Sequence, residues 1–186
     1  MNSNIHAVET LPFLPNTILV SGDGRNTGKT TFASQLIRHL SSQGEVFGIK
    51  TTPHIHFETA GLDIIESNEG YVVAEEKGMH GKDSSLFLQA GAKRVFLIMA
   101  GDSYIDRALN CILDAIKDTV TVAESGNMHK VLKPGYSFFV RQQGIDIRKT
   151  KYLAYNPLIV TNNGKEFDFD FERFSMKAQS LVLKEK

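Results

Sequence analysis

The chain has 186 residues, with 21 Lys and Arg against 21 Asp and Glu, and 41% of its side chains are apolar. This length and composition suit one globular domain with a sizeable core. A formal net charge of zero argues against a protein whose main task is to neutralise a nucleic-acid backbone. We therefore expect a single domain over residues 1–186 that binds no nucleic acid.

The single cysteine, Cys111, cannot form an intrachain disulfide and favours a reducing compartment. It stands beside apolar residues of an expected helix, so we predict that it packs in the core. The N-terminal residues lack the basic and then apolar pattern of a signal peptide, and no apolar run approaches the ~20 residues of a membrane helix. A cytoplasmic protein without a membrane partner is expected.

In chain order, the first expected strand is "TILVSG" (17–22), followed by a glycine-rich turn. A helix is predicted from Thr30, and Gly44 ends it. Its apolar positions recur at helical spacing: Phe32, Ala33, Leu36, Ile37 and Leu40. "EVFGIKTT" (45–52) is typical of a second strand.

The middle of the chain alternates in the same way. Residues 61–81 are turn-rich, and we predict one strand near Tyr71–Ala74 with loops around it. A short helix is expected over 82–92, a strand over 94–101, and one continuous amphipathic helix over 103–117.

The last third adds strands over 120–126, 136–141 and 157–162. In the tail, Phe167, Phe169 and Phe171 alternate with acidic residues, which predicts a strand with one buried face after a turn at Asn163–Gly164. Strands that alternate with helices indicate an α/β fold with a mostly parallel central sheet.

The turn "SGDGRNTGKTTF" (21–32) nearly matches the phosphate-binding pattern of Gly, four residues, Gly, Lys and Ser or Thr. Gly28, Lys29 and Thr30 supply its end, whereas Asp23 stands where the first glycine belongs. We expect the Asp23 side chain to point away from phosphate. The strand before the turn and the helix after it favour a P-loop NTPase-like three-layer fold, and the alternative is that Gly-Lys-Thr only caps a helix.

At the upstream end of this loop, Gly22 or Gly24 can supply the unusual backbone turn. Lys29 would reach the β and γ phosphates, and the backbone N–H groups at the helix start would bind the anion. Arg25 is the candidate arginine finger, so Lys29 and Arg25 are the predicted catalytic residues. The loop residues predicted to bind nucleotide are Gly24, Asn26, Thr27, Gly28, Lys29, Thr30 and Thr31.

Magnesium is the predicted metal, with the Thr30 hydroxyl and the Glu124 carboxylate on its side of the site. Glu124 ends an expected strand, and the alternative is a carboxylate that caps a loop. His54 and His56 lie two residues apart and make an incomplete metal site, so we favour phosphate or substrate contact through Lys50 and His54.

The sequence indicates the residues that contact the base less clearly than those that contact the phosphates. "TNNG" (161–164) could read a purine edge, but we prefer its interpretation as a turn. Asp146 follows a core strand and is a possible base acceptor. The Asn-Lys-x-Asp pattern that marks guanine binding is absent, so a preference for GTP over ATP does not follow from the residues.

Three further segments accompany the loop, in order: "GIKTTPHIHFE" (48–58), "GKDSSLFLQAGA" (81–92) and "VAESGNMHKVLKPGYSFFV" (122–140). With the loop, they resemble the molybdopterin-guanine dinucleotide biosynthesis protein B family, a branch of P-loop NTPases. The matching positions are Lys50, His54, Gly81 to Ser84, Ala90 to Ala92 and Glu124.

The resemblance implies a GTP-binding homodimer with weak hydrolysis, whose partners are a molybdopterin-related ligand or a guanylyltransferase. Asp83 and Ser84 are accordingly predicted to build the nucleotide or acceptor end of the site, with a plain helix cap as the alternative. Two other functions stay open: a small-molecule kinase or ATP-dependent ligase whose acceptor lid is 53–80, and a non-catalytic protein switched by nucleotide.

Overall fold

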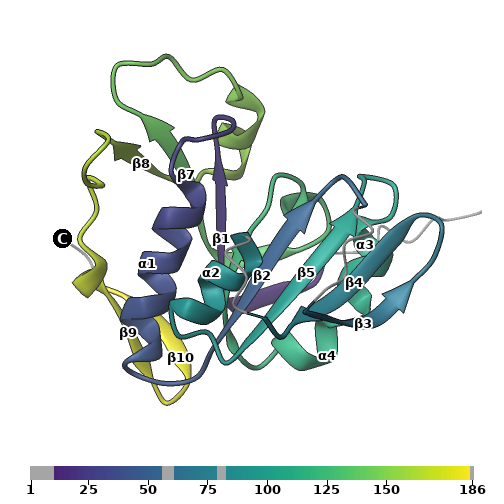
Figure 1. Ribbon diagram of the computed structural model, residues 1–186. Coiled ribbons are helices and arrows are strands. Elements are labelled where there is room, and N and C mark those ends of the chain that lie inside the picture. The colour runs from purple at the N-terminus through teal and green to yellow at the C-terminus, as the bar shows by residue number, and fades with distance from the viewer. Residues whose placement is uncertain (1–10, 56–60, 79–82, 185–186) are drawn as a thin grey trace, which may run out of the picture.

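The computed structural model describes residues 11–55, 61–78 and 83–184. Eight strands form one mixed sheet in the order β3–β4–β5–β2–β6–β1–β7–β8 (Figure 1). They are β1 (Phe13–Gly22), β2 (Val46–Thr52), β3 (Leu62–Ser67), β4 (Tyr71–Glu76), β5 (Arg94–Ala100), β6 (Val120–Glu124), β7 (Lys133–Gln142) and β8 (Leu158–Asn162). The predicted α/β fold with a mostly parallel sheet is confirmed.

Six neighbouring strands, from β5 across to β8, run parallel to one another. The hairpin of β3 and β4 extends this sheet at one edge, because β4 pairs antiparallel with β5. We expected loops where β3 lies, and that expectation is wrong. Most of the β3 residues are exposed, so no alternation of buried and exposed side chains marks the strand in the sequence.

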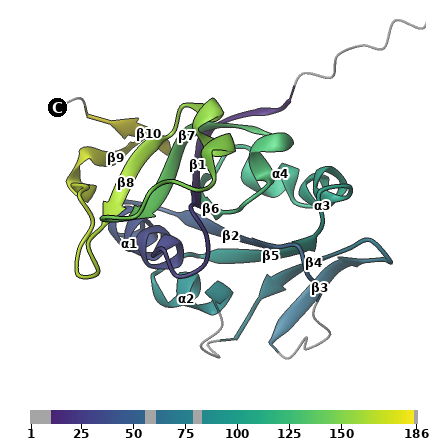
Figure 2. The ribbon, with the colours of Figure 1, turned by 90° about the horizontal axis from the view of Figure 1, so that it is seen from above.

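Helices cover both faces of the sheet (Figures 1 and 2). On one face α1 and α2 pack with the separate β9–β10 hairpin, and on the other face α3 and α4 pack over a second core. The remaining elements are α1 (Lys29–Ser41), α2 (Asp83–Gln89), α3 (Ile105–Asn110), α4 (Leu113–Ile116), η1 (Met128–Lys130), η2 (Thr150–Tyr155), η3 (Phe171–Arg173), β9 (Phe174–Lys177) and β10 (Ser180–Leu183).

The buried side of α1 is the one that the spacing predicts. All five of its predicted apolar positions are buried, and Phe32 is fully covered. This packing holds α1 against the sheet, so that its first turn lies at the carboxyl end of β1.

The predicted helix over 103–117 is interrupted. At Ile112 the backbone leaves the helical region, with φ −120° and ψ 0°. The bend lets Leu109, Ile112 and Ile116 all stay buried beneath the sheet. Cys111 lies on the outside of the bend and is exposed, so the prediction that it packs in the core is wrong.

The predicted strand in the tail is also wrong. Between the turn at Asn163 and β9, the backbone forms one isolated bridge, from Phe167 to Asn162, and no strand. The alternation of Phe167, Phe169 and Phe171 has another cause, because all three rings pack against Phe32 of α1. The rings are partly buried against a helix without the backbone pairing to a strand.

Candidate functional site

The turn between β1 and α1 has the backbone that an anion-binding loop requires. Gly24, Asn26 and Gly28 have φ values of 141°, 61° and 95°, which fold the chain back over the start of the helix. Gly28 immediately precedes α1, so no side chain caps the N–H groups of the first helical turn. These N–H groups and the helix dipole together favour a bound anion.

Close packing requires glycine at two of these positions. A Cβ atom on Gly28 would lie 2.5 Å from Asn162 Nδ2 and 3.2 Å from the Phe167 ring, and one on Gly22 would lie 2.6 Å from the carbonyl oxygen of Val140. Asn162, at the end of β8, also donates from Nδ2 to the Thr27 carbonyl oxygen over 3.2 Å. The loop is therefore held from the neighbouring parallel strands.

Lys29 lies across the loop that precedes it. Its ammonium donates to the Gly24 carbonyl oxygen and lies 3.5 Å from Thr27 Oγ1. Both are contacts within the phosphate-binding pattern itself. The lysine thus already stands beside the backbone that would enclose a phosphate.

Three predicted residues meet beside the first turn of α1. Lys50 and Glu124 pair across β2 and β6, so their side chains project from the same face of the sheet. Thr30 Oγ1 donates to Glu124 Oε2 over 2.8 Å, and Lys50 Nζ lies 2.6 Å from that oxygen and 3.2 Å from Thr30 Oγ1. Glu124 is buried, and the side chain of Lys50 is 13% exposed.

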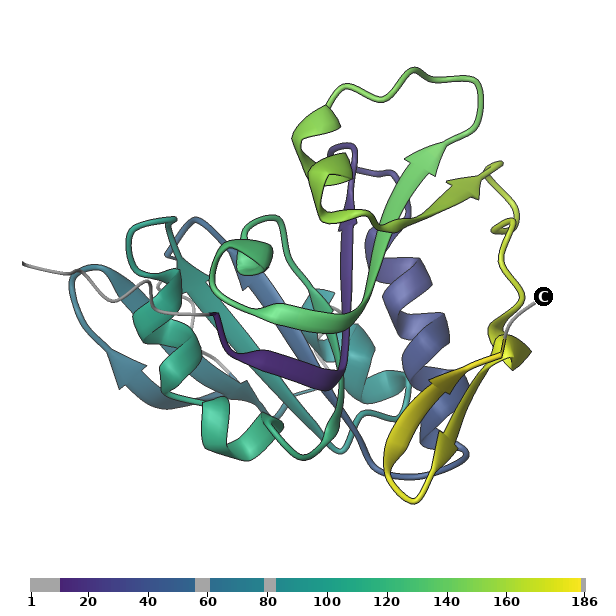
Figure 3. The same ribbon diagram turned by 180° about the vertical axis from the view of Figure 1, so that it is seen from behind.

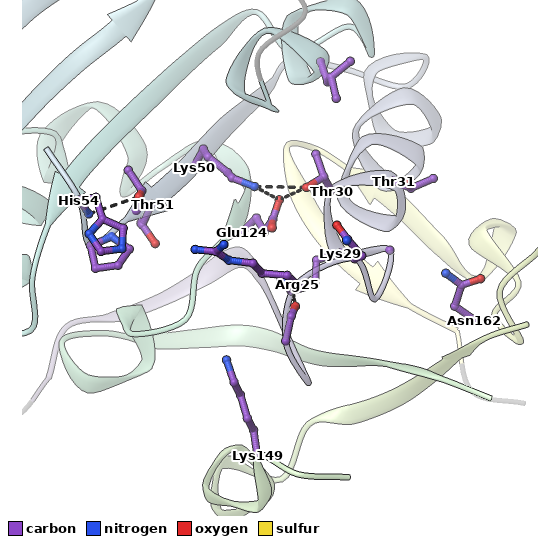
Figure 4. A pocket seen from close by; sticks show the side chains of 16 residues that line it. Arg25, Lys29, Thr30, Thr31, Lys50, Thr51, His54, Glu124, Lys149 and Asn162 are labelled. Carbon is purple, nitrogen blue, oxygen red and sulfur yellow. Dashed lines mark hydrogen bonds and ion pairs between the residues drawn. The ribbon is translucent and has the colours of Figure 1, made fainter. Parts of the chain in front are cut away.

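These residues line a cavity of about 850 Å³ at the carboxyl ends of the parallel strands (Figure 4). Among the described residues, four cationic side chains line it together with one carboxylate, that of Glu124. The lining residues are Gly24, Arg25, Asn26, Gly28, Lys29, Thr30, Thr31, Lys50, Thr51, Thr52, Pro53, His54, Leu86, Glu124, Lys149 and Asn162. This excess of positive charge suits a polyanionic ligand.

Not every predicted site residue reaches the cavity. Thr27 and Ser84 are not among the described residues that line it. Ser84 is buried and donates to Glu76 Oε2 over 2.7 Å, which ties the start of α2 to the end of β4. The side chain of Asp83 lies outside the described part of the chain, as does His56.

Of the described residues that line the cavity, six were not assigned to the site from the sequence: Thr51, Thr52, Pro53, Leu86, Lys149 and Asn162. Asn162 belongs to the "TNNG" segment, for which we preferred a turn, and it both precedes that turn and contacts the loop. Lys149 carries no signal in the sequence, because only the folded chain brings it to the cavity. Asp146, the possible base acceptor, is exposed and does not line the cavity within the described parts of the chain.

Comparison with models of protein families gives no match, and neither does comparison with curated proteins. Within the described parts of the chain, no three His, Cys, Asp or Glu side chains gather into a metal-binding group. No helix in those parts has both the length and the apolar character needed to cross a membrane.

Proposed function

We propose that this chain binds the phosphates of a purine nucleoside triphosphate, with Mg²⁺, in the cavity at the start of α1. The observation that carries the proposal is the convergence of Lys29, Lys50 and Arg25 on one cavity that also receives the N-terminus of α1. Cations and the N–H groups of a helix N-terminus at one place are the chemistry that binds polyphosphate.

The topology supports a P-loop NTPase-like fold. The loop follows β1, which lies between β6 and β7 in the parallel part of the sheet. Ligands of open α/β sheets bind outside the carboxyl ends of the strands. The alternative, in which Gly-Lys-Thr only caps a helix, does not account for Lys50, Glu124 and Arg25 at the same cavity.

Thr30 and Glu124 would hold the magnesium ion. Both supply oxygen atoms, and Mg²⁺ in such sites takes one or two protein oxygens while water and phosphate complete its shell. Lys50 now bridges these two oxygen ligands, so its ammonium would shift toward the phosphates when the ion binds. When bound, Mg²⁺ neutralises charge on the phosphate oxygens.

We propose slow hydrolysis by the chain alone. Arg25 is placed in the loop and lines the cavity, so it is the side chain available to stabilise charge on the terminal phosphate. The nucleotide is proposed to be GTP, with ATP as the alternative, and the physiological role to be an accessory one in molybdenum-cofactor assembly. The nucleotide preference, that role and a homodimeric state rest on the family resemblance alone.

A second candidate is a kinase or ligase on the same fold. Thr51, Thr52, Pro53 and His54 follow one another along one side of the cavity, beyond the phosphate-binding loop. An acceptor bound beside the nucleotide would contact these residues. Such an enzyme should prefer ATP and turn over rapidly once its acceptor is supplied.

Calorimetric titration with Mg–GTP and Mg–ATP tests the proposal. Lys29→Met should weaken nucleotide binding at least about tenfold, because it removes a charge-assisted contact with phosphate. Lys117→Met is the matched control, since Lys117 pairs with Asp114 on the other face of the sheet. The proposal fails if the parent chain binds neither nucleotide, or if folded Lys29→Met binds as tightly as the parent.

A further inference from the structure

Asp23, at the position of the first motif glycine, makes a set of contacts outside the cavity. Its side chain is 4% exposed and points to the segment that joins β7 to η2. The carboxylate accepts the backbone N–H of Arg148 over 2.9 and 3.1 Å to its two oxygens, and that of Lys149 over 2.7 Å. The expectation that Asp23 points away from the phosphate side agrees with this geometry.

The carboxylate of Asp23 stays ionised in this position. Burial acts to raise its pKa, but the two backbone N–H donors and the charges of Arg148 and Lys149 outweigh burial and lower the pKa below the usual value. The Arg148 guanidinium also donates to the Asp23 carbonyl oxygen over 3.4 Å. The first position of the loop thus has a charged anchor for a segment 125 residues further along the chain.

This anchor determines where the next side chain points. Lys149 follows Arg148 directly, and its side chain extends toward Arg25 and Glu124 from the far side of the cavity (Figure 4). The segment is also held at its other end, where the Tyr152 hydroxyl donates to the Gly126 carbonyl oxygen over 2.7 Å. Figure 3 shows the segment and η2 beside the carboxyl end of β1.

Two cations, Arg25 and Lys149, face each other there (Figure 4). Within the described parts of the chain, neither Arg25 nor Lys149 forms a side-chain ion pair. Glu124, the only carboxylate among the described residues that line the cavity, is bonded to Lys50 and Thr30. An anionic group of the ligand would therefore meet two cations from two segments.

We propose that Asp23 is a positioning residue that holds Lys149 over the cavity, and that Lys149 binds the phosphate chain of the nucleotide. This inference rests on the proposed function. It also accounts for the departure from the strict motif. Asp23 replaces a glycine that is dispensable because Gly24 supplies the positive φ of the turn, and the Asp23 carboxylate places a cation at the phosphates.

The variant Asp23→Gly restores the strict motif and tests the inference. If the loop were only an imperfect phosphate site, this variant would bind Mg–GTP as well as the parent or better. We expect binding about tenfold weaker, a difference of about 1.4 kcal/mol. Lys149→Met should weaken binding by a similar factor, and the double variant should lie within about twofold of either single variant because both remove the same contact.

Two further measurements separate positioning from plain destabilisation. Hydrogen exchange at the amides of Arg148 and Lys149 should accelerate in Asp23→Gly but not in Lys149→Met. Inorganic tripolyphosphate, used as a probe without base or ribose, should lose affinity in Lys149→Met as Mg–GTP does. Lys151→Met is the matched control, because the Lys151 ammonium lies over the Tyr152 ring and does not line the cavity.

The outcomes distinguish this inference from the proposed function. If the parent binds nucleotide and Lys29→Met weakens it, while Asp23→Gly and Lys149→Met bind like the parent, only the further inference is overturned. If Lys149→Met loses affinity for the nucleotide but not for tripolyphosphate, the proposal that Lys149 binds the phosphate chain is overturned. A parent chain that binds no nucleotide overturns both.

Discussion

Gly28→Ala is the substitution whose effect the structure determines most directly. Gly28 has φ +95°, and an added Cβ would lie 2.5 Å from Asn162 Nδ2 and 3.2 Å from the Phe167 ring. Asn162 would have to move, and its hydrogen bond to the Thr27 carbonyl oxygen would be lost. The ring of Phe167 would be displaced as well. It packs edge-on against the ring of Phe32, with 5.2 Å between the ring centroids.

The expected cost has two parts. A side chain in a left-handed conformation costs about 1–2 kcal/mol, and the lost Asn162 hydrogen bond adds about 0.5–1.5 kcal/mol. We therefore expect the free energy of unfolding to fall by about 1.5–3.5 kcal/mol. In a chain of this size that lowers the Tm by about 5–10 °C.

Two control variants separate these parts in denaturant titrations. Gly144 has φ +74° with no atom within 4 Å of an added Cβ, so Gly144→Ala measures the backbone cost alone, about 1 kcal/mol. Gly101 has open space and no positive φ, so Gly101→Ala should change stability by less than about 0.5 kcal/mol. If Gly28→Ala lowers the free energy of unfolding no more than Gly144→Ala does, the added Cβ does not clash with Asn162 and Phe167, and the reasoning is refuted.

Burial, together with the charges of Lys130 and Lys151, lowers the pKa of His129 from 6.5 to about 4. Between these values the native state binds fewer protons than the unfolded chain, so the free energy of unfolding falls by about 2 kcal/mol from pH 7 to pH 5. His129→Gln should flatten this dependence in denaturant titrations, and an unchanged slope would contradict the assignment. Ser84→Ala should lower the free energy of unfolding by about 1–3 kcal/mol, because it leaves buried Glu76 with one donor fewer. Its affinity for Mg–GTP should stay within twofold of the parent; an intact stability with weakened binding would instead place Ser84 in the site.

Some features could be predicted from the sequence because they depend on neighbours within one or two turns of chain. The buried side of α1 follows from apolar residues three and four positions apart. The parallel strands follow from short apolar runs between helices. The alternating phenylalanines of the tail correctly indicated side chains that pack against the core, although these are only partly buried. The alternation did not indicate that a helix, and not a strand, covers them.

Other features needed the register of the sheet and the path of the loops. Lys50 and Glu124 meet across 74 residues of chain, Thr27 and Asn162 across 135, and Asp23 and Lys149 across 126. Lys50 and Glu124 could be named as candidates from the sequence. Nothing in the sequence distinguishes Lys149 from the other lysines, because its position at the cavity depends on the hydrogen bond from its backbone N–H to Asp23. The sequence by itself indicated the glycine-rich turn and the helix behind it, since both patterns lie within a short stretch of chain. Only the tertiary structure decided which distant cations face that loop, because strand pairing and a buried carboxylate bring them there.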